Sequence, residues 1–126
     1  MKTAKIKIPI YDWELMFCHM DAGDDPEIFI KASRRIGIEP GDCVQFSDLM
    51  SRGAMGGGMC YVHSEERKLV VLIYPTLTPE NFYSTVGHEI YHCVYAIADH
   101  AQIKDEEASA YLIGYIWEKL YKTIQA

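Results

Sequence analysis

The stretch VGHEIYH, from Val86 to His92, holds the pattern His-Glu-x-x-His within a run of helix-forming, mostly apolar residues. Residues four apart on an α-helix lie one turn apart on the same face, so His88 and His92 can offer ring nitrogens to one cation. Imidazole is a favoured zinc donor, and two histidines leave room for a third protein ligand and a water. Glu89, rotated by about 100° from His88, can border the metal without binding it, as a general base would. The stretch therefore predicts a Zn²⁺ site on a helix, with two solvated histidines on a polar stripe as the alternative.

The segment around this motif carries strong helix signals. Thr78-Pro79-Glu80 combines an N-cap residue, a proline at the first position and an acid in the first turn, which predicts a helix from Thr78 to about Asp99. Apolar residues at helical spacing mark its buried side, and the two histidines fall on the adjacent stripe. We therefore expect the histidines to line a cleft beside the core.

A last helix is expected from about Asp105 to Thr123, and it offers a third metal ligand. Ala110 and Gly114 recur at helical spacing after Glu107, and two small residues would let this helix press against the metal-bearing one. Glu107 would then reach the site, with Glu106 as the runner-up. The alternative for these acids is a favourable interaction with the helix dipole.

The rest of the chain predicts an α+β fold, with a small antiparallel or mixed sheet packed against the two long helices. Strand patterning covers residues 5–11 and 13–20, and a short helix is expected from Pro26 to about Ile36. A hairpin is expected from 59–63 and 68–74. Its second strand is almost continuously apolar and should be central, which leaves the first as an exposed edge that could pair with an extended peptide.

Length and composition limit the possible classes. A chain of 126 residues is expected to form one domain, 1–126, and 49% hydrophobic with 24% charged residues is ordinary for a globular protein. A net charge of -6 disfavours nucleic acid or an anionic membrane as a partner. No apolar run approaches the roughly 20 residues of a membrane span, and the N-terminus lacks a signal-peptide core, so a cytoplasmic location is expected.

The four cysteines form no C-x-x-C pair, so neither a zinc ribbon nor a dense disulfide framework is indicated. They are interpreted as buried or free thiols. Cys93 directly follows His92 and is therefore turned off the expected ligand face.

These residues resemble the zincin metallopeptidases, in particular minimal phage- and prophage-type members in which an H-E-x-x-H helix is followed by an E-x-x-A-Y helix. The second motif here is Glu107 to Tyr111, and the resemblance covers mainly Thr78 to Trp117 and, more loosely, Ile8 to Tyr11. The resemblance implies that His88, His92 and Glu107 bind Zn²⁺, that Glu89 is the general base, and that a phage-encoded chain would act in the host cytoplasm.

The metzincin subclass is excluded, because its glycine and third histidine would stand where this chain has Tyr95 and Ala98. Asp99 and His100 lie close to that offset and are weak alternatives for the third ligand. No oxyanion partner is obvious; the three residues that could polarise a carbonyl are Tyr95, Tyr111 and His63.

The leading functional hypothesis is a zinc-dependent peptidase that hydrolyses peptide or protein substrates with a metal-activated water and Glu89 as base. The alternative is a catalytically inactive zincin-like module that binds metal and a host protein. A hydrolase of small amides is a third, weaker hypothesis. The sequence implies no oligomeric state.

Overall fold

The computed structural model describes residues 1–25, 27–39 and 56–125. Four strands form one mixed sheet: β1 (Lys2–Ile8), β2 (Trp13–His19), β3 (Gly58–His63) and β4 (Lys68–Ile73). Three helices lie in the described parts of the chain: α1 (Glu27–Arg34), α3 (Pro79–His100) and α4 (Glu106–Gln125). The α+β class and the mixed sheet predicted from the sequence are confirmed.

The strand order in the sheet is β1-β2-β4-β3. Two antiparallel hairpins, β1 with β2 and β3 with β4, join through a parallel pairing of β2 with β4. Among the strands that the structure describes, β4 is central and β3 lies at an edge, as the sequence predicts. The first strand is shifted from the expected 5–11 to Lys2–Ile8, because Pro9 cannot donate to a ladder and Asp12 adopts a left-handed φ of 59° in the turn.

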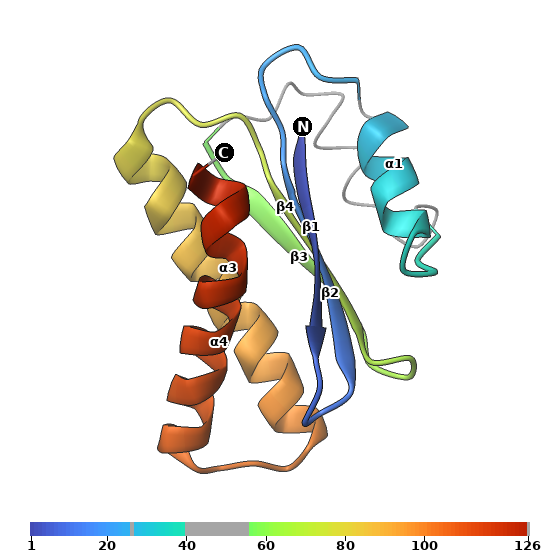
Figure 1. Ribbon diagram of the computed structural model, residues 1–126, viewed down its shortest axis with the longest axis vertical. Coiled ribbons are helices and arrows are strands. Elements are labelled where there is room, and N and C mark those ends of the chain that lie inside the picture. Colours follow the sequence, from blue (N-terminus) through green and yellow to red (C-terminus); the bar gives the residue numbers. More distant parts are fainter. Residues whose placement is uncertain (26, 40–55, 126) are drawn as a thin grey trace.

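Helices cover both faces of the sheet, with α3 and α4 on one side and α1 on the other (Figure 1). Successive side chains of a strand point to opposite faces, so β2 and β4 supply two cores at once. Leu15, Phe17 and Val71 belong to the core under α3 and α4, whereas Met16 and Val70 belong to the core under α1. This two-sided burial explains why both strands read as nearly continuous apolar runs.

α3 begins as its sequence predicts. Thr78 is the N-cap, and its hydroxyl oxygen accepts a hydrogen bond of 3.0 Å from the backbone N–H of Asn81, with Pro79 at the first helical position. The helix then runs to His100, slightly past the expected end. Among the residues that the structure describes, α3 included, no helix is both long and apolar enough to cross a membrane.

α4 packs differently from the expectation, and the predicted close contact through Ala110 and Gly114 is wrong. Both residues are exposed, and a Cβ on Gly114 would meet nothing within 4 Å. The buried residues of α4 are Leu112, Ile116 and Leu120, which join the core against α3 and β1. Large apolar side chains remove more surface from water than a small-residue stripe does, so they decide which face of the helix is buried.

Two glycine substitutions test this packing. Gly114→Ala should raise the free energy of unfolding by about 0.5–1 kcal/mol, because alanine is the better helix former and the added methyl group meets open space.

Gly58→Ala should lower the free energy of unfolding by about 1–3 kcal/mol, since its Cβ would lie 2.8 Å from the Leu72 carbonyl oxygen and 3.2 Å from Thr85. Urea unfolding followed by circular dichroism measures both. A destabilised Gly114→Ala would contradict the exposed position of this face.

Candidate active site

His88 and His92 lie on an exposed stripe of α3, in the middle of the helix. Their Nε2 atoms are 3.1 Å apart, and their ring centroids are separated by 4.8 Å. Two nitrogens that bind one tetrahedral zinc ion at about 2.05 Å would be separated by roughly 3.3 Å. The pair of imidazoles is therefore close to the arrangement that a shared zinc ion requires.

Glu89 lies on the same turn, is nearly buried, and lines the same cleft as the two histidines. Only 4% of its surface is exposed, because the helical repeat turns Glu89 by about 100° from His88, toward the core. Burial raises the pKa of the Glu89 carboxyl, while the nearby His88 and His92 lower it. A carboxylate is thus held at the inner side of the histidine pair, within the electrostatic reach of both rings.

Tyr74, which sequence reasoning did not single out, belongs to the core under α1 but is close enough to be affected by the charge of Glu89. It follows β4, is 3% exposed, and its hydroxyl has no hydrogen-bond partner among the residues described. Burial, with a smaller contribution from the charge of Glu89, raises the pKa of Tyr74 to about 12. The phenol therefore stays protonated at neutral pH. An apolar strand ending in tyrosine carries no sequence signal for this proximity.

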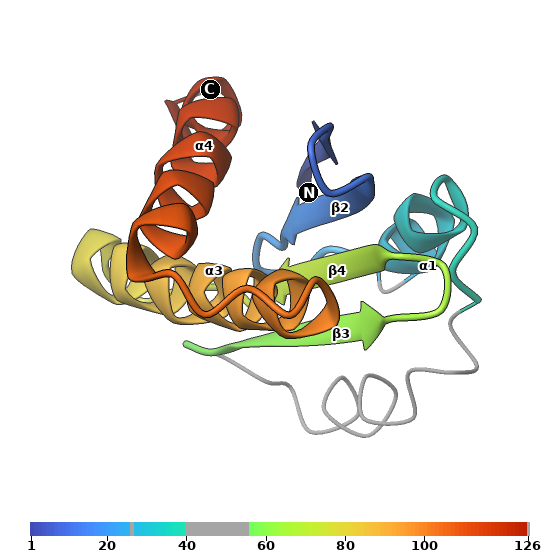
Figure 2. The same ribbon diagram turned by 90° about the horizontal axis from the view of Figure 1, so that it is seen from below.

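A cleft of about 740 Å³ runs between β3 and α3 and contains the motif. Gly58, Met59 and Cys60 line its β3 side, opposite His88 and His92. Figure 2 shows β3 extended alongside α3, and the two elements are in contact. The two histidines thus line a cleft beside the core, as expected, while their side chains remain exposed.

The cleft continues along α3 beyond the histidines. Tyr95, Asp99 and His100 all line it. Asp99 lies seven residues after His92, which corresponds to about 10 Å along a helix axis, and His100 lies further still. At that separation neither residue can share an ion with the histidine pair, although both were alternatives for the third ligand.

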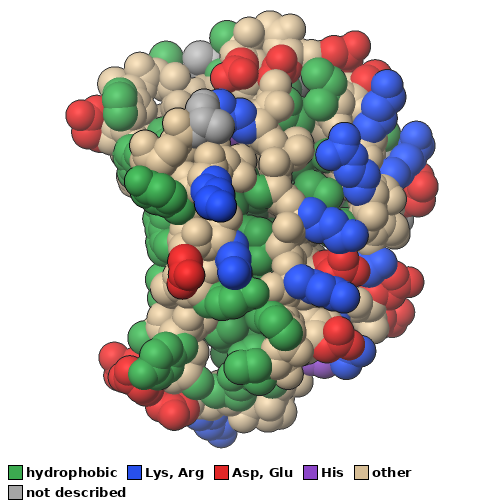
Figure 3. All heavy atoms as spheres, viewed as in Figure 1, with side chains coloured by type: hydrophobic (Ala, Val, Ile, Leu, Met, Phe, Trp, Pro, Cys, Tyr) green, Lys and Arg blue, Asp and Glu red, His purple; other side chains and the backbone are tan. Residues whose placement is uncertain are grey.

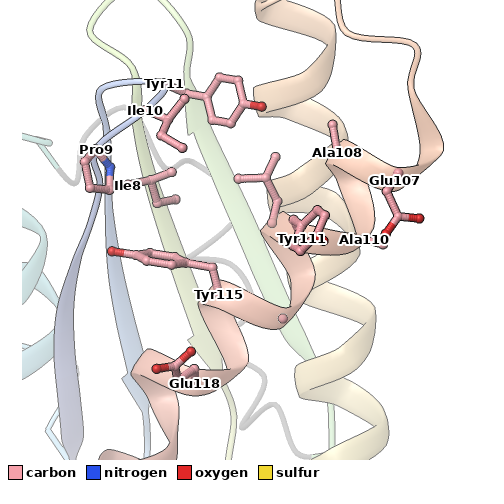
Figure 4. Close-up of a pocket in the computed structure, with 12 residues that line it drawn as sticks. Ile8, Pro9, Ile10, Tyr11, Glu107, Ala108, Ala110, Tyr111, Tyr115 and Glu118 are labelled. Atoms are coloured by element: carbon pink, nitrogen blue, oxygen red, sulfur yellow. The ribbon is translucent and has the colours of Figure 1, made fainter.

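Glu107 is not brought to the histidines. It is exposed on the first turn of α4 and lines a separate cavity of about 850 Å³ between α4 and the β1–β2 turn (Figure 4). Glu106, the runner-up, is also exposed. In the described parts of the chain, no group of three His, Cys, Asp or Glu side chains is placed to hold a metal ion. The contact through Ala110 and Gly114 that was expected to bring Glu107 to the histidines is not formed.

Asp105, which directly precedes α4, caps the start of this helix. The Asp105 carboxylate accepts a hydrogen bond of 3.0 Å from the backbone N–H of Glu107. Figure 3 shows apolar side chains gathered on the face where α4 meets the β1–β2 turn. The cavity near Glu107 is accordingly a mostly apolar surface, and its character differs from that of the histidine cleft.

The three candidates for polarising a carbonyl are separated by the fold. Tyr95 lines the histidine cleft and is 62% exposed, whereas Tyr111 lines the cavity of Glu107. His63 ends β3, and its Nδ1 is buried without a hydrogen-bond partner among the described residues. Of the three, Tyr95 is the one that lies in the cleft, one helical turn beyond His92.

Two thiols meet beneath the cleft, which the sequence did not predict. The Sγ atoms of Cys60 on β3 and Cys93 on α3 are 3.7 Å apart. Contact with Cys60 and burial together raise the pKa of Cys93 well above its ordinary value. The two cysteines are 33 residues apart in the chain, so their spacing carries no motif.

Zinc content tests the ligand pair. Purified wild-type protein should hold about one zinc ion per chain, and His88→Ala should weaken zinc binding more than about 100-fold, since loss of an outer-shell partner alone costs 10- to 100-fold. His100→Ala, on the same helix but away from the pair, is the control and should bind zinc as wild type does. Competition with a chelating dye measures the affinity, and elemental analysis measures the stoichiometry.

Glu107→Gln extends this test to the third ligand. The position of Glu107 on a separate cavity predicts unchanged zinc affinity for this variant. A loss comparable to that of His88→Ala would return Glu107 to the ligand set and contradict the placement of α4.

No protein-family model matches the chain, and neither the curated proteins nor the solved structures include one with significant similarity to it. The function is therefore inferred from the cleft itself.

Proposed function

We propose that the chain is a zinc-dependent peptidase whose active site is the cleft between β3 and α3. The observation that carries the proposal is the 3.1 Å separation of the His88 and His92 Nε2 atoms, with the buried Glu89 on the intervening turn. The resemblance to zincin metallopeptidases supports the same assignment. His88 and His92 would hold the zinc ion, which when bound supplies Lewis-acid polarisation of a carbonyl and lowers the pKa of water.

Glu89 is the proton carrier in this proposal. Its carboxylate accepts a proton from the attacking water and passes it to the nitrogen of the leaving amine. Burial supports this role, because a carboxylate in a low-dielectric position interacts strongly with nearby charges and is held in one place. Tyr95 is the best-placed donor for the developing negative charge on the substrate oxygen, since it lies in the same cleft.

The edge strand supplies a means of holding substrate. β3 pairs with β4 on one side, and within the described residues no strand pairs with its other side. An extended peptide can add to such an edge through backbone hydrogen bonds, which would lay it along the cleft past His88 and His92. Peptides and unfolded protein segments are therefore the proposed substrate class.

A second candidate is an inactive module that keeps the metal pair and binds another protein. It is favoured by one observation: no third His, Cys, Asp or Glu stands with His88 and His92 in the described parts of the chain. The two candidates differ in turnover. A digest of a peptide library with and without a chelator separates them, because only a peptidase gives new termini that disappear when zinc is removed.

Glu89→Gln tests the proton carrier. The substitution keeps the shape of the side chain and should leave zinc bound, while kcat/KM for library peptides should fall about 10²- to 10⁴-fold through loss of general-base catalysis. Glu118→Gln, an exposed change on α4, is the matched control and should retain wild-type rates. Hydrolysis that persists in the Glu89 variant would rule out this mechanism.

The position of Asp99 in the cleft predicts a preference for basic substrates. Its carboxylate lines the far end of the cleft, about 10 Å beyond His92, and makes no ion pair with any described side chain. A strand advances about 3.3 Å per residue, so a lysine or arginine about three residues from the cleaved bond would meet it. We expect a two- to fivefold preference for such peptides, as an exposed ion pair is worth about 0.2–1 kcal/mol. Asp99→Asn should abolish the preference, and equal cleavage of neutral peptides by wild type would contradict it.

A further inference from the structure

We propose that Cys60 and Cys93 form a site of oxidative modification, at which a two-electron oxidant of the peroxide class converts the two thiols into an intramolecular disulfide. The geometry that carries the proposal is the approach of the two Sγ atoms to 3.7 Å across the contact between β3 and α3. The oxidation requires neither a bound metal ion nor a peptide substrate.

The two sulfurs are close enough to bond after a small movement. An S–S bond is about 2.0 Å long, so the sulfurs must approach by roughly 1.7 Å, which is within the range of side-chain rotation and slight adjustment of an edge strand. β3 has the freedom for this adjustment, because among the described strands it pairs on one side alone. No unfolding of the core is required.

The two thiols differ in access, which sets the order of events. Cys60 is partly exposed and lines the cleft, so a small oxidant can reach it. Cys93 is 0% exposed and belongs to the core under α3. Oxidation therefore begins at Cys60, and Cys93 acts as the resolving thiol.

The chemistry balances in two steps. The Cys60 thiol attacks one oxygen of hydrogen peroxide, which breaks the O–O bond and gives a Cys60 sulfenic acid and one water. The Cys93 sulfur then attacks the Cys60 sulfur, forms the S–S bond and expels the hydroxyl group, which leaves as water with the proton of Cys93. Overall, two thiols lose two electrons and two protons, and one peroxide is reduced to two waters.

A competing thiol is kept away by the sheet. Cys18 lies in the core on the opposite face, beneath α1, whereas Cys60 packs against the core beneath α3. The four-stranded sheet therefore lies between Cys18 and the pair of Cys60 and Cys93. Cys43 lies outside the described residues.

Peptide mapping of the full-length protein tests the proposal directly. The four cysteines fall in four different tryptic peptides, with Cys60 in 53–67 and Cys93 in 69–104. After treatment with hydrogen peroxide the intact mass should fall by two hydrogens. Once the remaining free thiols are blocked, a non-reduced digest should contain 53–67 joined to 69–104. Reduction should separate the two peptides.

Three cysteine variants show which thiol reacts first and which thiols form the bond. Cys60→Ser should abolish the cross-link, Cys18→Ser should leave it unchanged, and Cys93→Ser should accumulate a Cys60 sulfenic acid that dimedone traps.

The oxidised wild type should unfold at a higher urea concentration than the reduced protein, because the bond closes a loop in the unfolded chain. Recovery of both peptides in reduced form, a different pairing, or over-oxidised Cys60 without a cross-link would overturn the proposal. A protein without zinc or peptidase activity that still forms the bond would separate this inference from the proposed function.

Discussion

The packing of one face of α3 against the sheet is the constraint on which the candidate site depends. Val86, Ile90 and Ile97 are buried there, and together they fix the rotation of the helix about its axis. With that rotation set, the 3.6-residue repeat turns His88 and His92 outward and Glu89 inward. The chemistry of the site thus follows from hydrophobic burial two or three residues away.

The wall of the cleft opposite α3 is the edge strand β3, which gives the cleft backbone groups that can form hydrogen bonds. A central strand would have its backbone groups paired on both sides, whereas β3 leaves one side of its backbone free within the described residues. Gly58 permits the close approach of this strand to α3, since a side chain there would collide with Leu72 and Thr85. The cleft therefore combines a rigid helical wall with a wall able to form main-chain hydrogen bonds.

Local signals in the sequence predicted most of the fold. The capped start of α3, the central β4 and the edge strand β3 were all predicted, because caps and hydrophobic periodicity act within a few residues. The motif predicted the approach of the two imidazoles for the same reason. The rotation of α4 was predicted incorrectly, since the choice between the small-residue stripe and the stripe of Leu112 and Ile116 depends on the surface offered by β1 and α3. Contacts between distant segments, such as Cys60 with Cys93, leave no periodic trace in the sequence.

The two hairpins, which join through the parallel pair of β2 and β4, have different roles in the structure. β1 and β2 come from the first 19 residues, whereas the described residues that line the histidine cleft fall between Gly58 and Gln102. The second hairpin and the helix that follows it thus form one contiguous segment that contains both walls of the cleft. The N-terminal hairpin, α1 and α4 act as its support: they cover the apolar faces that this segment cannot bury alone. Sequence change in the supporting elements can therefore be tolerated wherever apolar volume is kept, while the cleft segment bears constraints of spacing and charge as well.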